Sequence, residues 1–76
     1  MKTYLVKYKY TYSYLDENEE RCTDTDCQCE RFRCKKRDIE KEVRERIIEE
    51  EIMEEAGDRL ESLTILDYYV TTDIEL

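Results

Sequence analysis

An alternation of residue types near the start of the chain limits the folds open to it. Aromatic and β-branched side chains recur at every second position of residues 2–15, and polar side chains occupy most positions between them. The recurring residues are Tyr4, Val6, Tyr8, Tyr10, Tyr12 and Tyr14. A period of two is typical of a β-strand with one covered face. We therefore expect a long strand that places five of the seven tyrosines on one face.

A second strand is expected to return beside the first. Residues 16–20 are polar and acidic and indicate a hairpin turn. The returning strand lies within residues 21–36, with residues 28–35 as its clearest part. Phe32 and Cys34 would join the tyrosine face. Aspartates are poor strand formers, so we expect a bulge or an extended loop over residues 23–26.

A helix is predicted over residues 39–56, which contain two rows of apolar side chains and no proline or glycine. Asp38 stands at the N-cap position, and Gly57, the single glycine, stands where a helix commonly ends. Within the helix, Glu40 with Arg44 and Glu42 with Arg46 have the spacing of favourable pairs.

A third strand is expected at about residues 62–71, with broken alternation that two covered faces or a bulge would explain. The order β-β-α-β and a right-handed crossover place this strand beside the first. We therefore predict one α+β domain over residues 1–76, with an antiparallel sheet of order 2-1-3 and a helix on the tyrosine face.

The other face of this sheet would have no helix over it. Four cations would occupy it: Lys7, Lys9, Arg31 and Arg33. Leu5, with whichever of Leu63, Ile65 and Tyr69 share its side, would form an apolar strip there. Such a strip usually marks a partner site. We expect a symmetric homodimer through the strip or through the edge of the third strand.

Four cysteines, spaced C-x4-C-x-C-x4-C, admit three interpretations. They are Cys22, Cys27, Cys29 and Cys34. Four thiolates would suffice for a zinc ion in a structural or adaptor module, although zinc ribbons use C-x2-C turns. In a strand the inner pair and the outer pair face opposite sides, so the four would converge only if residues 22–29 formed a loop. Disulfides are the second interpretation. Ordinary thiols, with Cys34 buried, are the one we favour.

The charge balance excludes several functions. Lys and Arg number 13 and Asp and Glu number 21, a net charge of −8. This excess argues against direct contact with nucleic acid or an anionic membrane, and it favours packing over base stacking for the tyrosines. The chain has no histidine, the commonest general base, and we expect no enzyme. Without a long apolar run or a signal peptide, we expect a cytoplasmic protein.

Negative charge is concentrated in the predicted helix. Residues 38–58 hold ten acids and three bases, and no base lies between Arg46 and residue 58. The acids of this second half are Glu49, Glu50, Glu51, Glu54, Glu55 and Asp58. Acids in the last turns oppose the helix dipole and repel one another, so the arrangement costs stability. It is either a solvated face that aids solubility or a surface that presents carboxylates to a basic partner.

In this order of elements the chain resembles small acidic early proteins of bacteriophages. The matching stretches are residues 1–10, which begin Met-Lys-Thr-Tyr, residues 39–55 and residues 63–70. Members with a known role are commonly inhibitors of host machinery, including anti-CRISPR proteins, some of which mimic nucleic acid. The resemblance implies an inhibitor in the host cytoplasm that binds a basic protein or a nucleic-acid-processing complex, such as a CRISPR effector.

Overall fold

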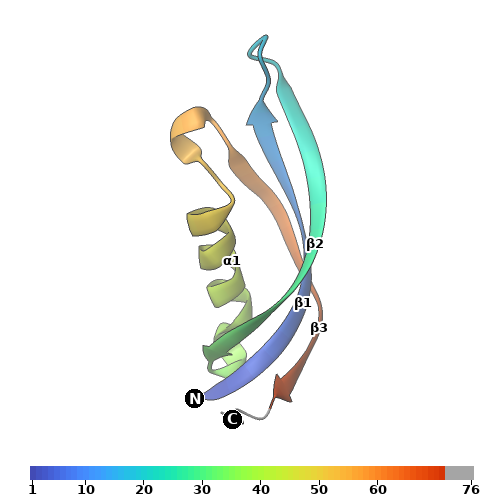
Figure 1. The fold of residues 1–76 in the computed structure, drawn as a ribbon, viewed down its shortest axis with the longest axis vertical. Coiled ribbons are helices and arrows are strands. Elements are labelled where there is room, and N and C mark those ends of the chain that lie inside the picture. The colour runs from blue at the N-terminus through green and yellow to red at the C-terminus, as the bar shows by residue number, and fades with distance from the viewer. Residues whose placement is uncertain (72–76) are drawn as a thin grey trace, which may run out of the picture.

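The computed structural model describes residues 1–71, and its elements follow the predicted order (Figure 1). The strands are β1 (Lys2–Leu15), β2 (Arg21–Cys34) and β3 (Arg59–Thr71); the helix α1 is Ile39–Glu50, between the short 3-10 helices η1 (Lys36–Asp38) and η2 (Glu54–Ala56). The three strands form one antiparallel sheet of order β2-β1-β3. The predicted α+β fold is confirmed.

The β1–β2 hairpin is regular along its whole length. Its register runs from Lys2 opposite Cys34 to Leu15 opposite Arg21 without a shift. The predicted bulge or loop over residues 23–26 is therefore wrong. Asp24 and Asp26 instead lie in the strand opposite Tyr12 and Tyr10, where both carboxylates are exposed to solvent at the edge of the sheet. An edge strand tolerates aspartates because their charges remain hydrated.

The bulges of this sheet lie in β3 instead. The β1–β3 register shifts between Lys7 and Tyr8 and again between Thr11 and Tyr12, which leaves Leu66 and Glu61 without a partner residue on β1. Each extra residue reverses the alternation beyond it. A bulge, one of the two explanations expected from the sequence, therefore accounts for the broken pattern, and β3 begins at Arg59 rather than near residue 62.

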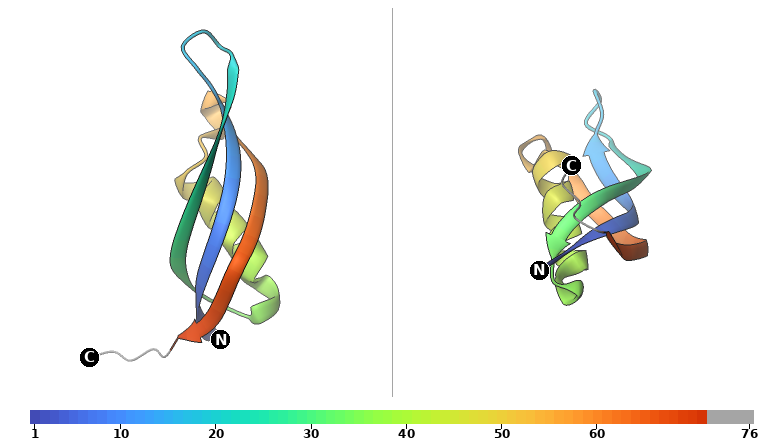
Figure 2. Two further views of the ribbon diagram at one scale, coloured as in Figure 1. Left: turned by 90° about the vertical axis from the view of Figure 1, so that its right-hand side faces the viewer. Right: turned by 60° about the horizontal axis from the view of Figure 1, so that its bottom comes forward.

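The core lies between α1 and the tyrosine face of the sheet. Val6, Tyr8 and Phe32 from the sheet and Val43 and Ile47 from the helix are at most 2% exposed. Figure 2 (left) views the sheet from its other side, with α1 behind it. Among residues 1–71 no helix crosses this second face, and none is long and apolar enough to span a membrane.

The helix is shorter than predicted. It ends at Glu50, and the chain continues through an irregular turn rather than through another helical turn to Ala56. The backbone N–H groups of Glu51 and Ile52 both donate to the carbonyl of Ile47, and the turn buries Ile52. The physical reason is the run of acids, which opposes the helix dipole and repels itself within this segment. Gly57, at φ 90°, ends η2 instead.

The uncovered face holds less apolar surface than expected. Leu63 and Ile65 lie opposite Tyr10 and Tyr8, and both pack against the core on the helix side. Tyr69 lies opposite Leu5, so these two residues form the strip on the uncovered face. The homodimer stays a prediction.

Candidate functional site

Five exposed carboxylates surround the end of α1 and the turn after it. We call them the acidic surface: Glu49, Glu50, Glu51, Glu54 and Glu55. No ion pair joins any of them to another residue in the part of the chain that the structure describes. The first half of α1 differs, because Arg44 pairs with Glu40 at 3.4 Å and Lys41 with Glu45 at 4.0 Å. The five carboxylates are therefore not neutralised by direct ion pairs in this part of the chain, and Arg44 and Arg59 are the cations that share a hollow with Glu54.

Asp58, predicted as the sixth member, has a different role. Its side chain is half-buried, and its Oδ2 accepts a hydrogen bond from the backbone N–H of Met53 at 3.2 Å. The N–H of Asp58 in turn donates to the Met53 carbonyl. Asp58 therefore closes the turn that presents Glu54 and Glu55.

An exposed apolar side chain lies beside Glu54 and Glu55 of the acidic surface. Met53 is 66% exposed, and it lines a shallow hollow of about 300 Å³ together with Ile52, Glu54 and Glu55. A flexible thioether adapts to irregular partner surfaces. The surface thus combines unpaired charge with one exposed apolar side chain.

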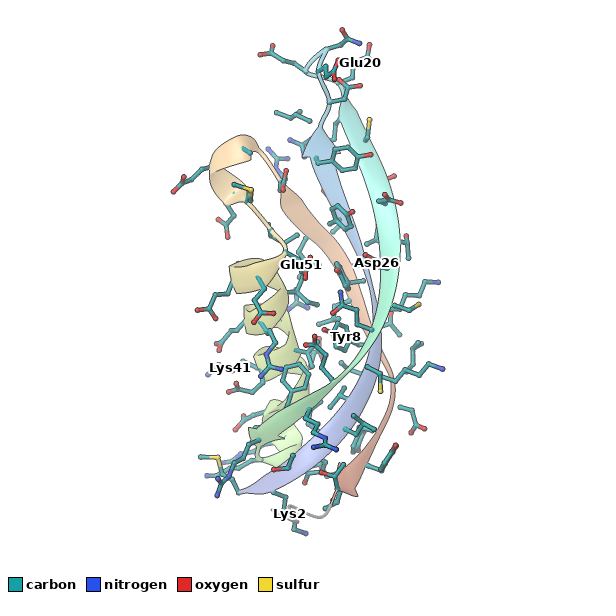
Figure 3. The ribbon with its side chains drawn as sticks, viewed as in Figure 1. Lys2, Tyr8, Glu20, Asp26, Lys41 and Glu51 are labelled. Carbon is teal, nitrogen blue, oxygen red and sulfur yellow. The ribbon has the colours of Figure 1, made fainter. Side chains whose placement is uncertain are left out.

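Two further acids extend this surface, and the sequence analysis did not assign them to it. Asp24 and Asp26 lie on the tyrosine face of β2, and Figure 3 shows Asp26 on the hairpin at the level of Glu51 on the helix side. Burial, reinforced by Glu51 and Asp26, raises the pKa of Tyr10 to about 12. Glu51 and Asp26 thus act on the same phenol from two elements. The sequence contained a signal for this placement, because both aspartates lie an even number of residues from Phe32 and therefore share its face in a continuous strand.

The tyrosine row serves packing in its inner part. Tyr8 and Tyr10 are each 1% exposed, with ring centroids 6.1 Å apart. The Tyr8 hydroxyl donates to Gln28 Oε1 at 3.0 Å, and the Gln28 amide donates to the Tyr10 oxygen at 3.2 Å. Burial and the nearby Glu30 carboxylate raise the pKa of Tyr8. These phenols are held neutral within the protein.

Arg46 joins the helix to β2. The expected pair with Glu42 is wrong, because the Arg46 guanidinium lies 3.9 Å from the centre of the Phe32 ring. It also donates to Glu30 Oε2 at 3.5 Å and to the carbonyl of Arg31 at 3.0 Å. A stacked, hydrogen-bonded guanidinium between two elements outweighs an exposed pair along one helix.

The four cysteines do not come together. All lie in β2, and strand alternation places exposed Cys27 and Cys29 on the uncovered face and Cys22 and Cys34 on the other, near opposite ends of the strand. In residues 1–71 no group of three or more His, Cys, Asp or Glu residues could hold a metal ion. The proposed four-cysteine zinc site is therefore not formed, because the strand continues where a loop was required.

No thiol or phenol with a shifted pKa is activated towards chemistry. Burial, with help from Glu42, raises the pKa of Cys34, and burial with the Asp16 carboxylate raises that of Cys22. Burial and nearby aspartates raise the pKa of Tyr12 as well. Each shift favours the neutral form, whereas nucleophilic catalysis needs the anion.

Comparisons of this chain with protein-family models, with curated proteins and with solved structures find no match. The protein is therefore described by its fold and its candidate site alone. The protein is a small α+β domain with an acidic surface at its helix end and an uncovered sheet face behind it.

Proposed function

We propose that this protein binds and inhibits a basic protein that handles nucleic acid, with a CRISPR effector complex as the first candidate. The acidic surface would occupy a groove that otherwise holds phosphates. The observation that carries the proposal is the set of five exposed and unpaired carboxylates at the end of α1. The resemblance to phage inhibitors supports the choice of candidate.

The cost of this arrangement supports a binding role over simple solubility. Glutamates aid solubility at any exposed position, but Glu49, Glu50 and Glu51 lie at the C-terminal end of α1, where they oppose the negative pole of the helix. Each of these three costs a few tenths to about 1 kcal/mol at low salt. The helix contains no base in its last turn that would reduce the cost. Binding to a cationic groove would offset it, and long-range attraction would speed association.

Met53 supports a protein partner in particular. Interfaces draw much of their affinity from a few apolar or aromatic side chains that become fully buried, whereas rim charges set orientation and association rate. An exposed methionine in a hollow that Glu54 and Glu55 also line fits this layout.

The test is inhibition of DNA cleavage by a purified CRISPR effector. Wild-type protein should inhibit, and the variant Glu50→Lys, Glu51→Lys, Glu54→Lys, Glu55→Lys should not, with its helix retained by circular dichroism. A second variant, Met53→Ser, should weaken inhibition without changing the charge.

The control reverses the charge of two exposed glutamates at another site. Glu17→Lys with Glu20→Lys changes the hairpin tip, and it should leave inhibition within about twofold of wild type. It is compared with the matched pair Glu51→Lys with Glu55→Lys. Undiminished inhibition by the folded Glu51/Glu55 variant, or equal loss in both pairs, would contradict the proposal.

A further inference from the structure

The uncovered face of the sheet carries the opposite charge to the acidic surface. Cross-strand partners share a face, so the register assigns each charged residue of the strands to a side. Six cations have register positions on the side of the uncovered face: Lys7, Lys9, Arg21, Arg31, Arg33 and Arg59. Two acids of β3 share it, Asp67 beside Lys7 and Glu61 at the second bulge. The acids of β2 all lie on the other side.

Four of these cations are free to bind a ligand on the open part of the face, whereas Arg59, at the start of β3, lines a hollow together with Arg44 and Ile48 of α1. Lys7, Lys9, Arg31 and Arg33 are exposed, and none forms an ion pair with another of residues 1–71. Arg21 is engaged within the protein, where it donates to Ser13 Oγ at 2.8 Å and to the Gly57 carbonyl at 3.0 Å.

The two acids do not cancel this charge. Glu61 Oε1 accepts the Ser13 hydroxyl at 2.6 Å, at the hairpin end of the face. Asp67 accepts the backbone N–H of Tyr68 at 2.9 Å, which occupies one of its oxygens. The four free cations therefore remain in excess over Asp67 in the middle of the face.

An aromatic ring accompanies the cations. Tyr69 is 57% exposed and lies opposite Leu5, which itself lies opposite Arg31. Proteins that bind single-stranded nucleic acid usually combine cations that contact the phosphates with aromatic rings on which the unpaired bases stack.

We propose that this face binds a single strand of nucleic acid, with phosphates on the four free cations and a base on Tyr69. Side chains two residues apart on a strand, such as Lys7 and Lys9, are separated by about 6.6 Å. Successive phosphates of an extended strand have a similar spacing. A single strand fits better than a duplex, because its bases are free to stack on an exposed ring.

The net charge of −8 does not forbid this contact. The acidic surface and the uncovered face lie on opposite sides of the sheet, in a molecule 23 and 21 Å across its shorter axes. At physiological ionic strength charges are screened over about 8 Å, so a ligand on one face is little affected by the other. The expectation of no nucleic-acid contact followed from the whole-chain charge alone, and this inference revises it. It rests on a different face from the proposed function and is tested separately.

The first measurement is fluorescence anisotropy of a labelled oligo(dT) strand against salt. Contact with four phosphates should give a slope of log K against log salt of about −2.8, since each phosphate of a single strand contributes about −0.7. Lys7→Gln with Lys9→Gln should weaken binding about tenfold or more and reduce the slope by about 1.4. The matched control, Lys41→Gln with Arg44→Gln, removes the same charge from the helix and should change neither.

The second measurement uses the wild-type chain and so does not depend on how a variant folds. Exposed Cys27 and Cys29 lie directly opposite Lys9 and Lys7, whereas Cys22 lies on the other face. Bound oligo(dT) should protect Cys27 and Cys29, and not Cys22, from alkylation read by mass spectrometry. Absence of binding at low salt, equal loss in both pairs of variants, or no selective protection would overturn the proposal. Equal affinity for poly-L-glutamate or for duplex DNA would also overturn it.

Discussion

Single residues show how well the alternation of side chains along a strand predicts the face on which each residue lies. Side chains of a strand must alternate between faces, so the sequence alone placed Tyr8, Phe32 and Cys34 in the core and separated Cys27 from Cys34, as the structure confirms. The same rule would have assigned Asp26 to the tyrosine side, but its low strand propensity suggested a loop. Regular pairing with β1 overrode that local preference.

The buried phenols predict a loss of stability in alkali. Unfolded tyrosines ionise near pH 10, whereas burial, Glu51 and Asp26 raise the pKa of Tyr10 to about 12 in the folded protein. Stability from this neutral phenol is complete below pH 10 and falls as the pH rises towards 12, because only the unfolded chain releases the proton. Urea unfolding at pH 8, 10 and 11 should show the decline, and Tyr10→Phe should make it shallower. Identical midpoints at the three pH values would refute this account.

Gly57 predicts a second effect at this scale. Its φ of 90° strains any L-residue, and an added Cβ would lie 2.7 Å from Leu15 Cδ1. Gly57→Ala should therefore lower the free energy of unfolding by about 1–3 kcal/mol in urea titrations. Glu55→Ala, in the same turn, should cost less than about 0.5 kcal/mol. Equal stability of the two variants would show that the turn adapts.

At the scale of elements, order and type were predictable and some boundaries were not. Local sequence patterns identified three strands and a helix, and the preference for a right-handed crossover gave the order of the strands in the sheet. The end of α1 escaped prediction because apolar spacing continues through Ile52, while repulsion among the glutamates and the burial of Ile52 decide where helical hydrogen bonding stops. The bulges at Leu66 and Glu61 depend on alignment with a strand distant in sequence, so no local pattern fixed them.

The acids at the end of α1 are expected to lower the stability of the protein. Glu50→Lys replaces an acid by a base in the last turn of α1, which should raise the free energy of unfolding by a few tenths to about 1 kcal/mol at low salt. Glu40→Lys at the other end breaks the pair with Arg44 and should destabilise instead. Both shifts should shrink in about 1 M salt. A stability change of the same sign in both variants would contradict the dipole argument.

At the scale of the whole molecule, folding separates charges that are mixed along the sequence. Segments of both signs alternate in the chain, yet the sheet places the free cations of β1 and β2 on one side and the acidic surface on the other. Net charge, a sum over the chain, could not reveal this separation. Strand parity predicts the side of the cations and also the side of Asp24 and Asp26, whereas the proximity of these aspartates to Glu51 required the packing of α1 on the sheet.

The central claim is that these two surfaces take different ligands, and amide chemical shifts of the ¹⁵N-labelled protein test it most directly. A deca-arginine peptide should shift the amides of residues 49–55 and of Asp24, and leave those of Lys7 and Lys9 unchanged. Oligo(dT) should do the reverse. Peptide-induced shifts that are largest at the acidic hairpin tip, residues 16–20, or that spread evenly over both faces would contradict the claim.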